Sequence, residues 1–258
     1  MPILSYLFAL LAATAAGMIN ALAGGGTLIT FPVLMAIGLP AVTANVTNTM
    51  ALWPGTVGGT LAQIHDLADQ KKRLLIVLPA GILGGLTGGL LLLHTTEALF
   101  SNLVPFLILL ATGLLAIQTP LRNWLARRQE KGAAKSFPEA WIFLPVFLAA
   151  IYGGYFGAAL GIILLAVLGL LLSDSLTHLN VLKQIISFSA NFTAALLFIF
   201  SGKVVWSVAL VMMVGALLGG SLGGRLAGKV KPNTLRWIVV TIGLIVGIIY
   251  LVKTYFVV

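Results

Sequence analysis

Three consecutive glycines near the N-terminus are the strongest chemical signal in this chain. Gly24, Gly25 and Gly26 follow Asn20 and precede Thr27, inside a stretch that is otherwise apolar. In a bilayer, a helix can break only where protein or a water-filled cavity satisfies the freed backbone groups. A helix restarting after the triplet presents backbone N–H groups and its positive dipole end, and glycine lets an anion approach closely. The pattern predicts an anion site at a broken helix, with tight helix crossing as the alternative.

A polar helix face follows in the next apolar segment. Its members lie three or four residues apart, with Leu52 between them, so they share one side of a helix: Asn45, Asn48, Thr49, Thr56, Thr60 and Gln63. Such a face either bonds neighbouring helices or lines a transport path. We expect it to point inward and favour the path, with Trp53-Pro54-Gly55 as a candidate hinge.

Lys183 places a positive charge near the start of an apolar segment in the second half of the chain. Gln184, Ser187 and Asn191 extend a polar stripe from it at helical spacing. A charge inside a membrane helix is costly unless it is paired or hydrated, so it predicts a functional role by default. We expect Lys183 to balance the charge of an anion; the alternative is a side chain that reaches the interface and contacts lipid phosphate.

The elements that position these residues are membrane helices. Hydrophobic residues make up 60% of the chain, charged residues 8%, and the mean hydropathy is +1.10, whereas a soluble domain carries about 25% charged residues. Most of the Lys and Arg behind the net charge of +9 fall in short loops, which indicates membrane topology and contact with anionic lipid rather than nucleic-acid binding. We expect a multi-pass protein of the cell membrane, specifically a bacterial inner membrane.

Ten apolar segments are predicted, roughly at 3–20, 27–38, 43–65, 74–93, 99–118, 139–157, 160–173, 179–200, 204–227 and 235–256. A full span needs about 17 to 25 residues, so the segments after Gly26 and after Gly161 are short and predict half-helices or parts of broken helices. The fold class expected is therefore all-α, with about eight to ten membrane segments.

A basic stretch divides the chain into two similar halves. Residues 1–118 form the first membrane repeat, 119–138 a polar linker, and 139–258 the second repeat. Glycines recur at every fourth position at equivalent places in both halves, Gly81, Gly85 and Gly89 in one and Gly215, Gly219 and Gly223 in the other. This spacing is typical of close helix packing in membranes. Internal duplication is the inference.

Loop charges predict how the halves face. Lys71–Arg73 and the linker are expected to be cytoplasmic, while the corresponding charges of the second half move to the loop that holds Lys229 and Lys231. The positive-inside rule then gives inverted repeats with both termini outside. An eight-span arrangement with parallel halves is the alternative.

Chemistry of other kinds has little support. The chain has no cysteine, and its six acids fall in or beside predicted loops: Asp66, Asp69, Glu97, Glu130, Glu139 and Asp174. Cation carriers and many proton-coupled carriers use a carboxylate within the membrane. The positions of the six acids therefore argue against those mechanisms. With no nucleophile–base pair or metal-ligand cluster in the sequence, we expect no metal, no cofactor and no enzymatic activity.

The first half resembles a known family. The string from Gly17 to Pro40, with the triplet, Pro32 and the ending Gly38-Leu39-Pro40, is followed by Asn45-Val-Thr-Asn-Thr49. It resembles the hallmark of the sulfite exporter TauE/SafE family of membrane permeases, although the second half reads Gly161-Ile162-Ile163 where a second triplet would stand. The resemblance implies a multi-spanning carrier of sulfite, sulfonates or other small organosulfur anions.

The function expected is secondary transport of a small anion by alternating access. Alternatives are an anion channel with the same polar lining and a membrane scaffold that docks partners through 119–138. The expected partners are the anion and membrane lipid. The predicted substrate-binding residues are Asn20, Gly24, Gly25, Gly26, Thr27, Asn45, Asn48, Thr49, Lys183, Gln184, Ser187 and Asn191.

Overall fold

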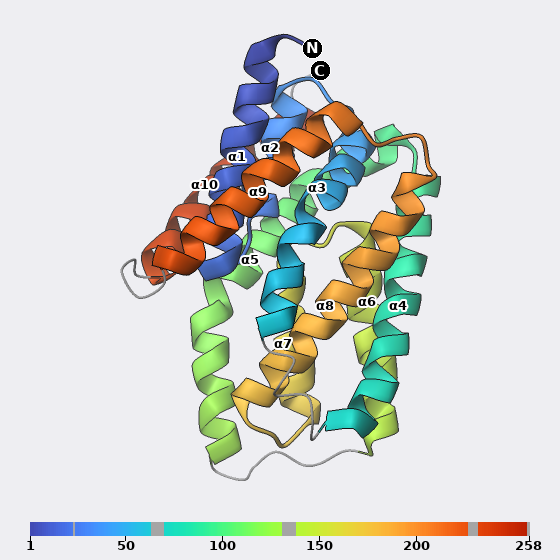
Figure 1. Ribbon diagram of the computed structural model, residues 1–258, viewed down its shortest axis with the longest axis vertical. Helices are drawn as coiled ribbons and strands as arrows, with labels where there is room; N and C mark the ends of the chain where they lie inside the picture. The colour runs from blue at the N-terminus through green and yellow to red at the C-terminus, as the bar shows by residue number, and fades with distance from the viewer. Residues whose placement is uncertain (23, 63–69, 131–137, 227–231, 257–258) are drawn as a thin grey trace.

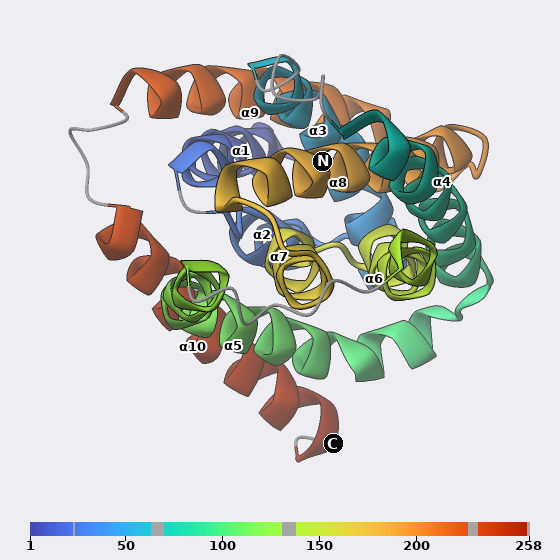
Figure 2. The same ribbon diagram turned by 90° about the horizontal axis from the view of Figure 1, so that it is seen from below.

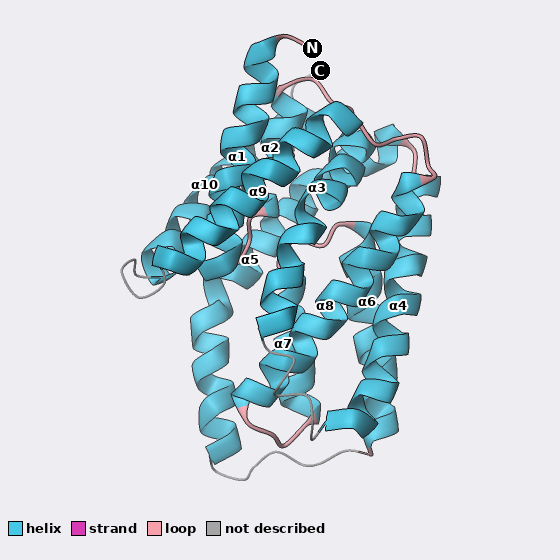
Figure 3. Cartoon of the chain, viewed as in Figure 1, coloured by secondary structure: helices cyan, strands magenta, loops and turns pink. Residues whose placement is uncertain are grey.

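The computed structural model describes residues 1–22, 24–62, 70–130, 138–226 and 232–256, and every regular element in these ranges is a helix (Figure 3). The helices in chain order are α1 (Ile3–Leu22), α2 (Thr27–Ala36), α3 (Ala41–Ala62), α4 (Lys71–His94), α5 (Glu97–Glu130), the short 3-10 helix η2 (Glu139–Ile142), α6 (Phe143–Tyr155), α7 (Leu160–Leu171), α8 (Leu176–Ile199), α9 (Trp206–Leu226) and α10 (Pro232–Tyr255).

The predicted all-α, polytopic membrane fold is confirmed. Six of the described helices are long and apolar enough to cross a membrane, namely α1, α4, α5, α8, α9 and α10. The helices after Gly26 and in the corresponding place of the second half, α2 and α7, have only 10 and 12 residues. Both are too short to span a bilayer, which needs about 17 residues or more. The short-segment prediction is therefore correct in both halves.

Helix α5 extends further than the apolar pattern indicates. It continues through Pro120 to Glu130, so most of the described part of the expected linker is helical. Leu125 is fully buried, and its side chain lies against Gly169 of α7. Gln129 donates a hydrogen bond to the carbonyl of Leu172 at 2.8 Å. The helix persists because residues 121–129 are mostly strong helix formers with an apolar side that packs on α7.

The glycine stripes mark the closest helix contacts. Helix α1 packs along α9, and α4 packs along α6 and α8. A Cβ atom on Gly219 would overlap the carbonyl of Thr14, and one on Gly85 would overlap the carbonyl of Ala190. Since only a residue without a side chain fits against another helix backbone at these points, the packing interpretation of the glycine stripes is confirmed.

Pairing between the two halves of the chain is reciprocal. Helix α1 of the first half packs on α9 of the second, and α6 of the second half packs on α4 of the first. Helices α3 and α8 contact each other, as do α5 and α10. Both chain ends lie at one end of the molecule, and the start of α4, the end of α5 and the α7–α8 connection lie at the other (Figures 1 and 2). Two related repeats would produce such an arrangement; the internal duplication stays a prediction.

An ionic cluster joins the halves at the end opposite the termini. Arg73 of α4 bonds Glu139 at 3.2 Å and also Asp174, which lies in the α7–α8 connection. Asp174 accepts from the Ser175 backbone at 2.7 Å and lies 2.8 Å from the His178 ring. Burial favours the neutral carboxyl, but the bonds from His178, Ser175 and Arg73 outweigh it and lower the pKa of Asp174. The cluster surrounds a cavity of about 600 Å³.

The lowered pKa of Asp174 predicts that the free energy of unfolding decreases in acid. A carboxylate whose pKa is lower in the folded state stabilises the fold above its unfolded pKa of about 4, and this contribution disappears as pH falls through the lower folded value. Asp174→Asn should reduce the free energy of unfolding by about 1 to 3 kcal/mol at neutral pH. Denaturant unfolding of the purified protein at pH 7 and at progressively lower pH measures this. The gap between variant and parent should shrink in acid; a gap independent of pH would contradict the ionic role.

Candidate anion site at the helix breaks

The first helix break lies between α1 and α2 and is closed by the chain's own groups. Gly24 and Gly25 adopt φ values of +80° and +93°, which favour glycine. The Gly24 amide donates to the Ile19 carbonyl at 2.9 Å, and the Gly26 amide donates to the side-chain oxygen of Asn20 at 2.7 Å. In this conformation, two amides of the triplet are thus engaged within the protein. An incoming anion would compete with the Asn20 side chain for the Gly26 amide.

The glycines of this break also allow close packing. A Cβ on Gly25 would lie 2.9 Å from a methyl of Leu115 in α5, and one on Gly26 would lie 2.7 Å from the Ala16 carbonyl. Thr27 opens α2 and is half-buried, while the hydroxyl of buried Thr30 donates back to the Gly26 carbonyl at 3.2 Å. The triplet therefore serves helix packing here and is also placed to expose backbone amides if α2 shifts.

The second helix break lies between α6 and α7 and forms without a glycine triplet. Gly157 has φ +76° and Ala159 has φ +61°, a left-handed conformation that an alanine adopts at some cost. The Tyr152 hydroxyl donates to the Ala158 carbonyl at 2.7 Å and fixes the loop. Each half therefore contains a break that is followed by a short helix, and the two breaks are lined by different residues.

Helix α3 reaches the second break from the other half of the chain. Asn45, with 1% of its surface exposed, donates its amide to the carbonyl of Tyr155 at 2.8 Å, at the end of α6. Asn48 is 2% exposed, and the side-chain oxygens of Asn45 and Asn48 are buried without a hydrogen-bond partner. Buried polar atoms of this kind are rare and call for a water, an ion or a ligand. These oxygens accept hydrogen bonds, so they are suited to a donor such as water and can meet an anion only through such a donor.

Helix α8 supplies the positive charge. The Lys183 ammonium donates to the side-chain oxygen of Asn180 at 2.5 Å, and its methylenes lie against Gly161 in the first turn of α7. A Cβ on Gly161 would be 3.5 Å from the Lys183 Cδ atom. Asn191, two turns further along α8, places its side-chain oxygen 3.6 Å from where a Cβ of Gly157 would stand. Lys183 and Asn191 therefore flank the two ends of the second break.

The predicted site residues thus divide into two groups. Asn45, Lys183 and Asn191 gather at the second break, whereas Asn20, Gly24, Gly25, Gly26 and Thr27 form the first. Gln184 and Thr49 are half-buried on the same helices, and the Ser187 hydroxyl is buried without a partner. The side chains of Thr56, Thr60 and Gln63 lie outside the described residues.

Aromatic residues connect the two breaks and were not predicted as part of the site. Phe31 in α2 meets Phe156, at the second break, edge to face with ring centres 5.5 Å apart. Trp53 of α3 lies against Phe192 of α8, 5.4 Å between ring centres. The sequence does not reveal these contacts, because a Phe in an apolar segment can face either lipid or the protein core. The aromatic contacts join α2 to the second break and α3 to α8.

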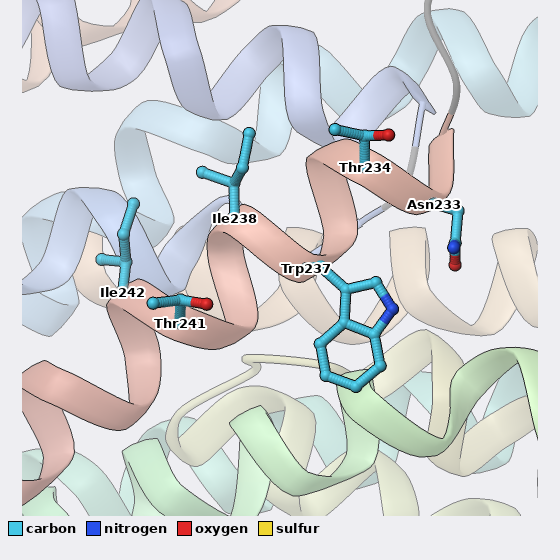
Figure 4. A pocket seen from close by; sticks show the side chains of 6 residues that line it. All are labelled: Asn233, Thr234, Trp237, Ile238, Thr241 and Ile242. Carbon is cyan, nitrogen blue, oxygen red and sulfur yellow. The ribbon is translucent and has the colours of Figure 1, made fainter.

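A separate groove lies on the outer side of α10 (Figure 4). It measures about 520 Å³ and is lined by Asn233, Thr234, Trp237, Ile238, Thr241 and Ile242. The opposite side of α10 carries its buried residues, among them Val239, Gly243 and Gly247. A groove on the exposed side of a single helix is typical of a surface that contacts acyl chains. All of its lining residues belong to α10, so the groove is separate from the candidate anion site.

A multi-pass helical body with broken helices and polar side chains at the breaks is typical of membrane transporters. The family model described as sulfite exporter TauE/SafE matches residues 9–250. The chain therefore belongs to this family, and it is a multi-pass membrane protein.

Relatives with descriptive names agree with this class. A "Probable membrane transporter protein" of Haemophilus influenzae is 32% identical over 204 residues, 79% of this chain and 78% of that protein. The "Probable membrane transporter protein YfcA" of Escherichia coli is 27% identical over 208 residues, 79% of this chain and 74% of that protein. "Probable membrane transporter protein ORF9" of a Sinorhizobium species is 27% identical over 223 residues, 84% of this chain and 80% of that protein. No solved structure matches the chain.

Proposed function

We propose that this transporter moves a small anion, sulfite, a sulfonate or a related organosulfur anion, by alternating access, and that it is not an enzyme. The observation that carries the proposal is the position of Lys183 against the second helix break, with Asn45 and Asn191 beside it. A cation held within an apolar helical body attracts an anion more strongly than it would in water, because the surrounding dielectric constant is low. The family's name supports the organosulfur class.

The acids of the described region support an anionic substrate. Glu97 accepts from the Val42 amide at 2.9 Å, while Glu139 and Asp174 are bonded to Arg73. Each of these carboxylates already has a partner away from Lys183, so none of them neutralises its charge. A negatively charged substrate would supply the counter-charge for Lys183 that the described side chains do not provide.

Alternating access is part of this proposal, and polar contacts of α3 with the second half of the chain support it. Asn45 bonds across the halves to Tyr155, and the Thr47 hydroxyl accepts from the Val205 amide at 3.1 Å. Helices α3 and α8 cross at the aromatic contact of Trp53. One packed group of helices is built around α1 and α9 and another around α4, α6 and α8, and two such groups can rock against each other around a site between them. In this proposal, the ionic cluster around Arg73 closes one end of the path.

Exchange of radiolabelled sulfite into proteoliposomes loaded with unlabelled sulfite tests the function. Sulfonates, thiosulfate, sulfate and carboxylates serve as competitors. Saturable exchange blocked by a subset of these anions is the expected result. Unitary currents far above carrier turnover would instead indicate a channel. Folded protein without flux, and with loss of function only when residues 119–138 are replaced, would indicate a scaffold.

Substitution of Asn48 distinguishes a role in anion transport from a role in the stability of the fold. Because its buried oxygen has no partner, Asn48→Ala should leave the free energy of unfolding unchanged or slightly higher. In this proposal, that oxygen holds a water that bridges to the anion, so sulfite exchange should fall about tenfold, equivalent to about 1.4 kcal/mol. Asn45→Ala is the comparison, since it removes the bond to Tyr155 and should lower stability as well as exchange. Thermal unfolding and exchange are measured on both. Normal exchange by the Asn48 variant would remove this residue from the site.

A further inference from the structure

An arginine of α10 is buried without a counter-charge among the described side chains. Only 6% of the Arg236 surface is exposed, and its guanidinium donates to the hydroxyl of Thr119 in α5 and to the side-chain oxygen of Asn233. Its Nε atom is also buried and has no hydrogen-bond partner in the described part of the chain. Both acceptors are neutral, whereas a buried charge is costly unless an opposite charge accompanies it. The environment of Arg236 therefore predicts a bound anion.

The acids of the described region do not neutralise this arginine. Three of them are bonded to other groups, namely Glu97, Glu139 and Asp174. Glu130 ends α5, about three helical turns or about 16 Å beyond Thr119, which is too far for an ion pair with a guanidinium that bonds Thr119. Asp66 and Asp69 lie outside the described residues, so one variant of the test is chosen to detect neutralisation by them.

The guanidinium lies beside the outer groove of α10. Asn233 bonds the guanidinium, and the Trp237 ring centre lies 5.7 Å from its central carbon; both residues line the groove of about 520 Å³ (Figure 4). Asn233 and Thr234 form one end of the groove, in the first turn of α10, while Ile238 and Ile242 continue it along the helix. The first turn also presents backbone N–H groups without a helical acceptor and the positive end of the helix dipole. The groove thus has a polar, positive end and an apolar end.

The surroundings of the groove indicate where its occupant comes from. Helix α10 is long and apolar enough to cross a membrane, so its exposed side faces lipid. A free phosphate would pair with the guanidinium but leave the apolar end of the groove empty. A phospholipid fits both ends, and basic pockets beside membrane helices are suited to anionic head groups.

We propose that the first turns of α10 bind an anionic phospholipid. The lipid phosphate takes the place of the exposed Asn233 side chain and accepts from the guanidinium of Arg236 and from the amides of the first turn. One acyl chain lies along Trp237, Ile238 and Ile242. A charged acceptor bonds a guanidinium more strongly than a neutral amide oxygen does. A zwitterionic lipid binds more weakly, because its own cation competes with Arg236 for the phosphate.

The shift in melting temperature that a lipid produces in purified protein, in a neutral detergent, measures this binding. Phosphatidylglycerol is compared with phosphatidylcholine of the same acyl chains and with glycerol phosphate, which has the head group without the chains. In the parent protein, half of the full shift should need about tenfold less phosphatidylglycerol than phosphatidylcholine, and glycerol phosphate should have little effect. A shift as large with glycerol phosphate would indicate a site for free anions and overturn the lipid site.

Arg236→Gln removes the charge and should raise the half-effect concentration of phosphatidylglycerol about tenfold, with little change for phosphatidylcholine. Arg128→Gln is the matched control, because Arg128 also lies over a tryptophan, 5.5 Å from the Trp124 ring centre, but in the last turn of α5. The control should respond like the parent protein. A preference for phosphatidylglycerol that persists in Arg236→Gln would overturn the proposal.

Asn233→Asp tests the uncompensated charge even if Arg236→Gln does not fold. It places a carboxylate against the guanidinium with almost no change in size. The melting temperature without lipid should rise, and the shift caused by phosphatidylglycerol should shrink, because the new carboxylate occupies the place of the phosphate. No change in either value would mean that Arg236 is already neutralised, by Asp66 or Asp69, and would overturn the lipid site. These measurements do not require transport, so their failure leaves the transport proposal standing.

Discussion

Lys183→Gln is expected to weaken the apparent affinity of anion exchange about thirtyfold while leaving a folded protein. The ammonium is the positive charge at the second helix break, and among the described residues it donates a hydrogen bond to Asn180. Removing one partner of a desolvated charge pair costs about 2 kcal/mol or more, which is roughly a thirtyfold loss of apparent affinity. Glutamine is one bond shorter than lysine, but it keeps a polar end without the charge. The fold should therefore persist, because no carboxylate among the described residues depends on Lys183.

Exchange of labelled sulfite and thermal unfolding in detergent measure the two effects of Lys183→Gln separately. Lys253→Gln is the matched control, since Lys253 is an exposed lysine in the last turn of α10. The control should exchange like the parent protein. If Lys183→Gln protein melts and exchanges normally, the ammonium only reaches toward lipid phosphate. Lys183 would then no longer be part of the candidate anion site.

Gly219→Ala is expected to have the largest effect on the fold. The added methyl group would overlap the Thr14 carbonyl where α9 crosses α1. A backbone atom cannot move away as a flexible side chain does, so one of the two helices must shift. Overpacking of this kind costs about 3 kcal/mol, and α1 carries Asn20 and the start of the first break. Stability and exchange should therefore fall together.

Gly113→Ala provides the control for this substitution. Gly113 lies within α5, and a Cβ there would meet open space. Alanine favours a helix over glycine by about 1 kcal/mol, so this variant should be as stable as the parent protein or slightly more so. Melting temperature and monodispersity on gel filtration compare the two variants. Equal stability of Gly219→Ala and Gly113→Ala would mean that α1 and α9 do not pack as closely as the structure shows.

Much of the helical layout follows from the sequence alone because apolar runs and short interruptions are local features. The segments at 27–38 and 160–173 correspond to α2 and α7 within two residues at each end. The end of α5 was missed because Arg127 and Arg128 make residues 119–130 polar overall, while the apolar contact of Leu125 that keeps them helical is tertiary. A polar stretch of sequence can therefore still continue a helix.

The candidate site was predicted in its parts and not in its arrangement. Residue types and spacing were sufficient to select Asn45, Lys183 and Asn191, since polar groups in membrane helices are conspicuous. Their meeting at the second break depends on the Tyr155 carbonyl, Gly157 and Gly161, which carry no polar side chain to reveal it. The left-handed Ala159 likewise has no sequence signal, because alanine is a helix former.

Access to the polar helices from one side at a time is the central claim, and a single cysteine tests it most directly. The parent chain has no cysteine, so Ser187→Cys carries one thiol, at the partnerless hydroxyl of α8. Its reaction with a membrane-impermeant thiol reagent is followed in right-side-out and inside-out vesicles, with and without methanesulfonate, which does not consume the reagent. The account predicts reaction in both orientations and slowing by the anion in both. Reaction from one side only, or rates that the anion leaves unchanged, would contradict alternating access to an anion site between α3 and α8.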